Sequence, residues 1–288
     1  MATMRQIRNR IRVAGNIAQI TGAMEMVAAA RLKKAQDRLM AARPYVSALQ
    51  EIVTELLQSW EEEEEARHPL AAERPRHPTG LFVITADRGL CGSYNSAIIR
   101  QTQETLAAEG PENVRLMVAG RRGRSFFRRR MIELHPLPVE EAGELGLVAA
   151  METAEAFRRS FLAGEVNRVV VLYTRFVSPI TQRPVVEQLL PIPWPNAEGT
   201  VRRDYLSEPD KVHLAAKLLP QYVTARLYYA MLESMASEHA ARMTSMSAAT
   251  DNAREMISSL TLALNRARQA AITKEISEIV SGTEALST

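Results

Sequence analysis

The 288-residue sequence lacks several features, and each absence excludes a class of protein. Cys91 is the only cysteine, so an intrachain disulfide is excluded, which fits a reducing compartment. No apolar run approaches the roughly 18 residues of a membrane-spanning helix, so we expect any membrane role to come through a partner. The N-terminal residues carry arginine but no apolar core, and we expect no secretory signal. Aromatic residues make up only 5%, few for a ligand-binding enzyme but natural for a helical rod.

Motifs for nucleotide, metal and nucleophilic chemistry are missing as well. None of the 13 glycines is followed by lysine, and no two are separated by one residue, so neither a Walker A loop nor a dinucleotide fingerprint is present. The five histidines have no metal-ligand spacing, and no Ser-His-Asp order stands out. The glycine-rich stretch Gly89–Gly92 favours a tight strand-to-helix connection over an anion site. Cys91 within it is more simply a small buried residue than a reactive thiol. We therefore expect no active site, cofactor or metal.

Glycine and proline are absent from residues 221–281, a span of 61 residues rich in alanine, leucine, methionine, glutamate and arginine. These are good helix formers, and one helix of this length would extend about 90 Å. One compact domain cannot cover such a helix, so it needs a partner along its length. Its inward candidates are mostly small, which allows close approach of two helices. They are Met246, Ala249, Ala253, Ile257, Leu260, Leu264, Ala267 and Ala271.

The partner is predicted at the other end of the chain, where an apolar heptad repeat begins at Ile7. Steps of four and three residues give 15 positions, of which 13 are apolar. They are Ile7, Ile11, Ala14, Ala18, Thr21, Glu25, Ala28, Leu32, Ala35, Leu39, Ala42, Val46, Leu49, Val53 and Leu56. Such a sustained repeat is typical of a coiled coil. An ordinary helical bundle is the simpler interpretation of such stripes, but the length argues against it.

A second apolar stripe overlaps the first near Met24. It runs through Ile17, Ile20, Met24 and Val27. A seam between two helices needs one stripe, so the second predicts a further partner. Gly15 and Gly22 weaken this helix by about 1 kcal/mol each relative to alanine, and Pro44 is a potential kink.

Between the two ends, the pattern changes to that of an α/β domain. Continuous apolar runs predict strands buried on both faces, and they alternate with helical segments, which favours a mostly parallel sheet. The expected strands are 81–85, 114–118, 169–173 and 185–190, and the expected helices are 93–108 and 147–161. A turn at Gly120 leads into an arginine-rich segment, and Pro191, Pro193 and Pro195 close the domain. Residues 205–219 lead into the long helix, with Pro209 and Pro220 as possible starts or kinks.

These patterns divide the chain into a coiled-coil helix at residues 1–60, a linker at 61–79, an α/β domain at 80–204 and a second coiled-coil helix at 205–288. The acidic run 61–65 is a solvated end to the first helix. The net charge is +3, and arginines cluster at 5–12 and at 121–130. Either cluster can lie on a solvated face, contact an acidic protein or touch nucleic acid. The predicted fold class is α/β with a long antiparallel coiled coil, made by the two chain ends around an inserted Rossmann-like domain.

Four separated stretches resemble the gamma subunits of F-type ATP synthases. They are AMEMVAAAR at 23–31, TADRGLCG at 85–92, NRARQA at 265–270 and ITKEISEIVSG at 272–282. They occur in the family's order, and the likeness runs from end to end. In that family the terminal helices form the central stalk, which turns inside a ring of alpha and beta subunits. The α/β domain lies at the stalk's foot against the epsilon subunit and the membrane-embedded c-ring.

The resemblance implies a rotary shaft that couples proton flow through the c-ring to ATP synthesis at the beta subunits, with no active site of its own. It implies a peripheral location on the cytoplasmic face of the bacterial cell membrane. It assigns partner-contacting roles to Met24, Arg242, Arg268, Gln269, Thr273 and Glu275. Regulation by a cysteine pair, as in chloroplast members, is not expected with Cys91 alone. The alternatives are a coiled-coil scaffold, a nucleic-acid adaptor, or an enzyme with a cryptic α/β site.

Overall fold

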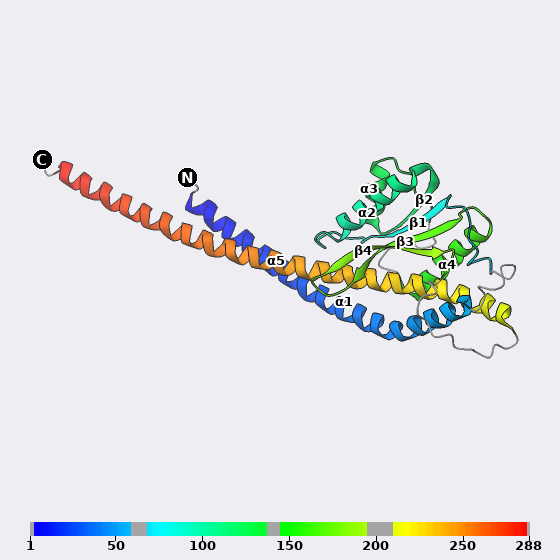
Figure 1. The fold of residues 1–288 in the computed structure, drawn as a ribbon. Coiled ribbons are helices and arrows are strands. Elements are labelled where there is room, and N and C mark those ends of the chain that lie inside the picture. Colours follow the sequence, from blue (N-terminus) through cyan, green and yellow to red (C-terminus); the bar gives the residue numbers. More distant parts are fainter. Residues whose placement is uncertain (1–2, 59–67, 137–144, 195–209, 287–288) are drawn as a thin grey trace. The chain divides into compact units, whose positions relative to one another are not determined.

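The computed structural model describes residues 3–58, 68–136, 145–194 and 210–286, and of residues 281–286 it describes only the backbone. The chain divides into two compact units. Unit 1 consists of Met1–Ala28 and Met243–Thr288, and unit 2 of Ala29–Arg242. The two longest helices, α1 (Met4–Gln58) and α5 (Lys211–Leu286), each contribute to both units. Within each unit they run antiparallel (Figure 1).

Both long helices begin with side-chain caps that the sequence encodes locally. At α1, the Thr3 backbone N–H donates to Gln6 Oε1 over 2.9 Å, while the Gln6 N–H lies 3.3 Å from Thr3 Oγ. This reciprocal arrangement is a capping box. At α5, Asp210 Oδ1 accepts a 2.8 Å hydrogen bond from the His213 N–H. Acceptors at these ends satisfy N–H groups that no helical carbonyl reaches.

The predicted heptad seam of α1 is confirmed by burial. Ten of its 15 positions are buried and the other five are partly buried. The eight predicted inward positions of α5 are all buried or partly buried as well. In unit 2, Val46, Leu49 and Val53 of α1 share one core with Val223 and Leu227 of α5. The two chain ends therefore pair as expected.

Unit 2 also contains a four-stranded sheet in the order β2-β1-β3-β4. Its strands are β1 (Thr79–Ile84), β2 (Val114–Ala119), β3 (Arg168–Phe176) and β4 (Gln182–Leu190). β1 pairs in parallel with β2 and β3, whereas β4 pairs antiparallel with β3. The mostly parallel sheet is confirmed. Pro184 lies within β4, which tolerates it because β4 is an edge strand.

Alternate residues of the sheet enter two different cores. Leu81 and Val83 of β1 pack with α2 (Tyr94–Glu109) and with Phe127 of α3 (Arg121–Arg129). Phe82 and Ile84 instead join a larger core with α4 (Leu147–Leu162), α1 and α5. The sheet is thus covered on both faces, as its continuous apolar runs predict. A short 3-10 helix, Pro111–Asn113, precedes β2.

The expected strands and helices are all present, with ends that differ by a few residues, and the predicted fold class is confirmed. One element was missed: the arginine-rich segment is the helix α3 rather than part of a turn. Pro44 and Pro220 both lie inside helices, so Pro220 does not start α5. The acidic run 61–65, Pro195 and Pro209 lie outside the described residues. The division at 1–60, 61–79, 80–204 and 205–288 stays a prediction.

Candidate functional site

The helix pair of unit 1 is joined by small residues and one central polar contact. Ala14 and Ala28 of α1 and Ala253 of α5 are buried. Thr21 Oγ lies 2.7 Å from Thr250 Oγ, and each hydroxyl also lies within hydrogen-bond distance of a backbone carbonyl one turn earlier. Because each hydroxyl also has a backbone acceptor on its own helix, the hydrogen bonds of these two threonines are satisfied without a charged side chain.

The second apolar stripe of α1 lies largely exposed in unit 1. Ile20 is 61% exposed and Val27 is 54% exposed, whereas Met24 is partly buried. Val13 and Ile17 extend the stripe toward the N-terminus and are nearly half exposed. Contiguous exposed apolar residues on a soluble surface mark an interaction site. This stripe, residues 13–27, is therefore a candidate contact surface.

Four predicted interface residues lie on α5 in the same unit. Arg268, Gln269, Thr273 and Glu275 are exposed, and the Thr273 hydroxyl donates to the Gln269 carbonyl over 3.0 Å. Ile272 and Ile276 between them are about half exposed. With 3.6 residues per turn, Arg268, Ile272 and Glu275 share one helix face. This end of α5 therefore presents charged and apolar side chains together.

Arg242 is different, because it is buried in unit 2. Its side chain is 11% exposed, and its guanidinium lies 2.8 Å from a carboxylate oxygen of Glu238. It also lies 3.5 Å from the carbonyl of Gly89, in the connection after β1. Burial raises the pKa of Glu238, and the Arg242 charge opposes this shift. Arg242 thus holds a strand-end loop against the long helix.

Neighbouring polar side chains complete this junction, and the sequence reasoning missed them. The Tyr94 hydroxyl lies 2.9 Å from Ser234 Oγ, and the Ser237 hydroxyl donates to the Thr174 carbonyl over 3.0 Å. Burial raises the pKa of Tyr94 and of Cys91, so both stay protonated at neutral pH. The sequence did contain a signal for this contact, because two serines occupy positions on the otherwise apolar seam of α5. That seam runs through Val223, Leu227, Ala230, Ser234, Ser237 and Ala241.

A second buried polar group joins α5 to β3 and β4. Glu233 is 92% buried at its side chain, and burial raises its pKa to about 7 although Arg175 lies 3.8 Å away. Glu187 accepts hydrogen bonds from the Tyr173 hydroxyl and from Arg226 Nε, each over 2.9 Å. The Arg226 guanidinium also reaches Gln50 of α1 over 3.2 Å. Both long helices and the sheet edge are therefore tied together.

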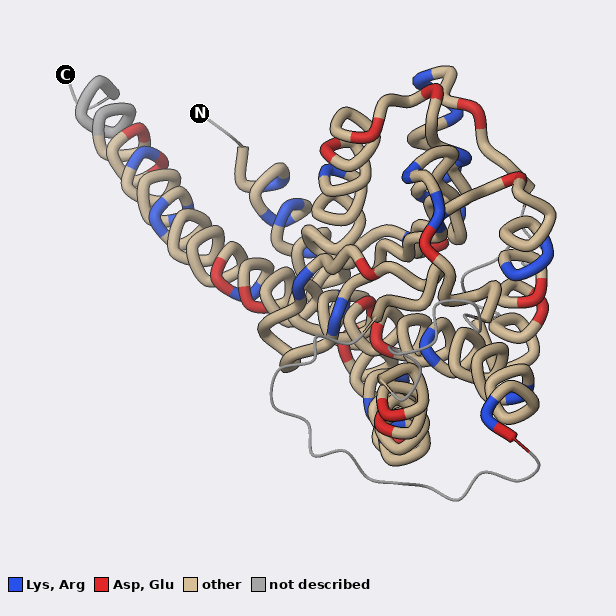
Figure 2. The backbone as a smooth tube through the Cα atoms, turned by 45° about the vertical axis from the view of Figure 1, so that its right-hand side comes forward, with Lys and Arg blue, Asp and Glu red and all other residues tan. Residues whose placement is uncertain are grey.

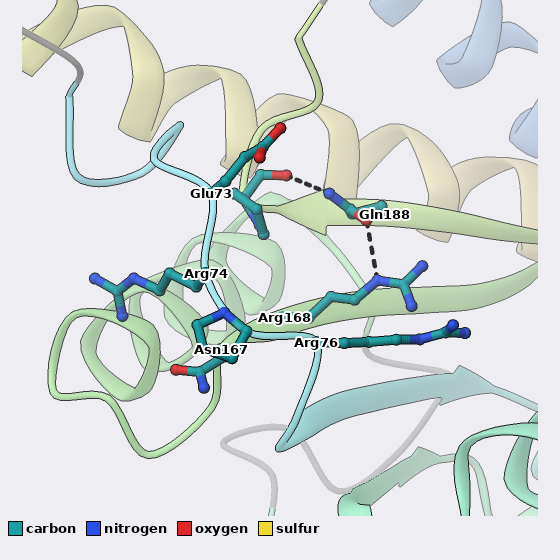
Figure 3. A pocket seen from close by; sticks show the side chains of 8 residues that line it. Glu73, Arg74, Arg76, Asn167, Arg168 and Gln188 are labelled. Carbon is teal, nitrogen blue, oxygen red and sulfur yellow. Dashed lines mark hydrogen bonds between the residues drawn. The ribbon is translucent and has the colours of Figure 1, made fainter. Parts of the chain in front are cut away.

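A cavity of about 440 Å³ lies beside the starts of β1 and β3 (Figure 3). Arg76 and Arg168 both bind the buried carboxylate of Glu109, whose pKa they lower. Arg74 points away from them and stacks over Phe161 at 4.1 Å. The arginines are therefore engaged within the chain and do not converge on a ligand. The lining consists of Glu73, Arg74, Pro75, Arg76, Asn167, Arg168, Gln188 and Pro191.

Among the described residues, no group of three histidine, cysteine or acidic side chains is placed to hold a metal ion. Within the same residues, no helix combines the length and apolarity needed to cross a membrane. The candidate sites are the exposed stripe at 13–27, the exposed end of α5 and the enclosed polar junction at Arg242.

Comparisons with known proteins agree across the whole chain. The family model described as ATP synthase matches residues 3–286. The ATP synthase gamma chain of Desulfitobacterium hafniense is 47% identical over 286 residues, covering 99% of this chain and 100% of that one. A chain from the central stalk and c-ring of the Tetrahymena thermophila mitochondrial ATP synthase is 26% identical, with a TM-score of 0.59 over 80% of this chain and 99% of that one.

The fold extends to a more distant relative. A chain of the Euglena gracilis mitochondrial ATP synthase has a TM-score of 0.65 at 17% identity, covering 98% of this chain and 94% of that one. The predicted resemblance is thus confirmed over nearly every residue, and it agrees with the paired terminal helices and the inserted sheet. The chain belongs to the ATP synthase gamma chain family.

Proposed function

We propose that this chain is the central rotary shaft of a proton-translocating ATP synthase. One observation carries the proposal: in unit 1, two antiparallel helices close over a seam of small residues while the stripe at 13–27 and the end of α5 stay exposed. A paired coiled coil is stiffer than one helix, which suits the transmission of torque. Its exposed apolar side chains make contacts without directional bonds, so a surrounding sleeve can slide over them.

The proposed partners are the alpha and beta subunits around the helix pair, and the epsilon subunit and c-ring at the α/β domain. The similar solved structures support this, since they come from the central stalk, the rotor and the c-ring assemblies of ATP synthases. Membership of the gamma chain family gives the same set of neighbours. The chain is a membrane-associated subunit in this assignment, peripheral through the c-ring, on the cytoplasmic face of the bacterial cell membrane.

The proposed beta-subunit contacts are Met24 on α1 and Arg268, Gln269, Thr273 and Glu275 on α5. Exposure of the four α5 side chains supports a role in contacts that form and break with each step. Arg242 has a different proposed role: its burial against Glu238 and Gly89 supports an effect on coupling through the α/β domain.

The chain contributes no active site of its own in this proposal. The arginines around the cavity are bound to Glu109 and Phe161. ATP chemistry therefore belongs to the surrounding subunits, and this chain changes their conformations in sequence. An enzyme hidden in the α/β domain would instead show turnover by the isolated chain.

The test is co-purification with an alpha-beta ring, followed by ATP-driven proton pumping in vesicles. We expect the wild-type chain to assemble and to support pumping. Met24→Lys places a charge beside the exposed stripe, so it is expected to lower the ratio of pumping to ATP hydrolysis more than it lowers assembly. Met24→Leu keeps the apolar surface and is the matched control. Unchanged pumping by the lysine variant would contradict the proposed contact role of Met24. Failure of the wild-type chain to assemble would overturn the proposed function.

A further inference from the structure

Helix α3 carries the highest local charge of the described chain, and the proposed function does not use it. Five of its nine residues are arginine and none is acidic. A sixth arginine, Arg130, follows directly and stacks over Phe126 at 3.7 Å. Lysine and arginine positions are blue in Figure 2. This density of one charge on a short helix calls for an explanation.

The arginines of α3 are arranged around one small residue. Ser125 is exposed and points outward, opposite the buried Gly123 and Phe127. Its neighbours on the helix surface stand three and four residues away in each direction, and all four are arginines. They are Arg121, Arg122, Arg128 and Arg129, and all are exposed. These four arginines, hereafter the arginine ring, therefore surround Ser125, whose side chain is small.

This arrangement is unfavourable for α3 taken alone. Like charges three and four residues apart repel each other. Arginines in the first turn also meet the positive end of the helix dipole, and that turn contains no acidic residue. Asp87 lies against the ring, where its Oδ1 accepts a 2.8 Å hydrogen bond from the Arg121 N–H. A local arrangement that opposes stability indicates a functional role.

The helix is nevertheless held rigidly in place. Gly120 has φ +92°, and a Cβ there would lie 2.0 Å from the Thr85 carbonyl oxygen. The Thr85 hydroxyl donates to the Ala119 carbonyl over 2.8 Å and accepts from the Gly123 N–H over 3.0 Å. Phe127 is fully buried beneath the sheet. The ring is thus fixed on the domain, which suits docking of a preformed partner surface.

The side chains favour carboxylates over the other anions. All the charges are arginine, whose planar fork binds a carboxylate or phosphate with two parallel hydrogen bonds. Single-stranded nucleic acid needs aromatic faces for stacking, but Phe127 is buried and Phe126 is covered by Arg130. Insertion into a lipid surface needs exposed apolar side chains, and beside the ring only Met131 is a strongly exposed one among the described residues.

We propose that the arginine ring of α3 docks an acidic surface on a neighbouring protein subunit, with a carboxylate seated over Ser125. The inference rests on the proposed function in one respect: the neighbouring subunit is expected to be another subunit of the assembled ATP synthase. The interaction is ionic and lies on the domain surface, so it weakens with added salt.

The test maps the contact with a zero-length reagent. Carbodiimide joins amines to carboxylates in ion-pair contact but does not react with guanidinium, so Arg128→Lys and Arg129→Lys supply the reactive amine and keep the charge. Arg115→Lys is the matched control, because Arg115 lies 3.6 Å from Glu165 of the same chain. In the assembled complex, we expect positions 128 and 129 to cross-link to aspartate or glutamate of another subunit, and position 115 to cross-link within the chain.

A second substitution blocks the ring without removing an arginine. Ser125→Glu places a carboxylate among the four guanidiniums and stabilises α3, whereas Ser125→Gln has the same size and no charge. In the Arg128→Lys background, we expect Ser125→Glu to lower the intersubunit cross-link yield by about ten-fold or more, and Ser125→Gln to leave it within about two-fold.

Three results would overturn the inference. They are cross-links confined to this chain, equal yields from the two Ser125 variants, and loss of anionic-vesicle or oligonucleotide binding in Ser125→Glu without any intersubunit cross-link. Each presupposes that the chain assembles with the alpha-beta ring and supports pumping. A chain that does neither would overturn the proposed function instead.

Discussion

The same two helices are held together differently in the two units. In unit 2, α1 and α5 share a large core with the sheet, the partly buried ion pair Arg226–Glu187 joins α5 to β4, and Arg226 also contacts Gln50 of α1. In unit 1, small residues and the Thr21–Thr250 contact form the seam, while the stripe at 13–27 stays exposed. In unit 2, the two helices are therefore packed firmly against the sheet. Unit 1 instead presents an exposed surface that partners can contact without directional bonds.

This difference shows how one heptad repeat serves two purposes. The repeat pairs the helices in both units, and the side chains beside it decide what else is bound. In unit 2 they are large apolar and buried charged residues, whose removal leaves cavities or unpaired charges. In unit 1 they are exposed, so their substitution changes contacts with partners more than the stability of the chain.

The largest effect is expected at the buried pair in unit 2. Arg242→Met leaves the mostly buried Glu238 carboxylate without the cation that it contacts, which should lower the free energy of unfolding by about 3–5 kcal/mol. Chemical denaturation of the full chain measures this. The double variant Glu238→Gln, Arg242→Met removes the stranded charge and should recover most of the loss. A double variant no more stable than the single one would show that the pair is not the cause.

The next effect compares equivalent truncations of apolar side chains. Leu227→Ala in unit 2 removes a fully buried side chain and should destabilise the chain by about 2–5 kcal/mol. Ile20→Ala in unit 1, at a position 61% exposed, should stay within about 0.5 kcal/mol. Denaturation midpoints measure both. Comparable losses at the two positions would contradict the contrast between the units, since they would require Ile20 to be covered within the chain.

A pH-dependent effect is expected at Glu233. Its pKa in the folded chain is raised to about 7 by burial, above the unfolded value of 4.5, so the folded state binds the proton more tightly. Its contribution to stability is therefore full below pH 4.5 and is lost as the pH rises through 7, by about 1–3 kcal/mol. Relative to wild type, Glu233→Gln should gain stability over this range.

The measurement is the difference in unfolding free energy between the two chains at several pH values. Arg175, Glu187 and Arg226 also face this carboxyl group, and all are retained in both chains. A difference that does not change with pH would mean that the pKa of Glu233 is the same in the folded and unfolded chains, and it would contradict the expectation.

The smallest effect is expected from replacing a glycine with alanine, in α1 of unit 1 and in the α/β domain of unit 2, and comparing the changes in stability. A Cβ at Gly15 meets nothing within 4 Å, so Gly15→Ala should stabilise α1 by about 1 kcal/mol. A Cβ at Gly164 has equally open space, but φ there is +74°, so Gly164→Ala should destabilise unit 2 by about 1–2 kcal/mol. Thermal melting of the two variants should shift in opposite directions. A loss of stability in Gly15→Ala would indicate that this glycine is needed for close approach.

Much of the fold could be predicted from periodicity. The seam from Ile7 to Leu56 is a local repeat, so its burial follows from the pairing of two helices of matching pattern. The same holds for β1 and β3, whose continuous apolar runs predicted strands covered on both faces. α3 was missed because nine residues with five arginines and a glycine show no apolar period, and its helix depends on contacts with Thr85 far away in the sequence.

The candidate site was predictable in part. Arg242 was singled out through the family resemblance, and Glu238 is its local neighbour four residues earlier on α5, but its contact with Gly89 follows only from folding, since Gly89 lies 153 residues away in the chain. The contact between Tyr94 and Ser234 was missed because the two residues are 140 positions apart in the chain, although Ser234 lies on the periodic seam of α5. The predicted roles of Met24, Arg268, Gln269, Thr273 and Glu275 stay predictions, and the Met24→Lys variant tests the first of them.

The sequence by itself determined the two long helices and the four strands, that the chain ends pair, and which family the chain belongs to, because each depends on local pattern or on matched residues. Only the tertiary structure decided which apolar stripe is covered, which carboxylates are buried with raised pKa values, and that β4 runs antiparallel at the sheet edge. Those properties depend on what lies nearby in space, and residues far apart in sequence supply it.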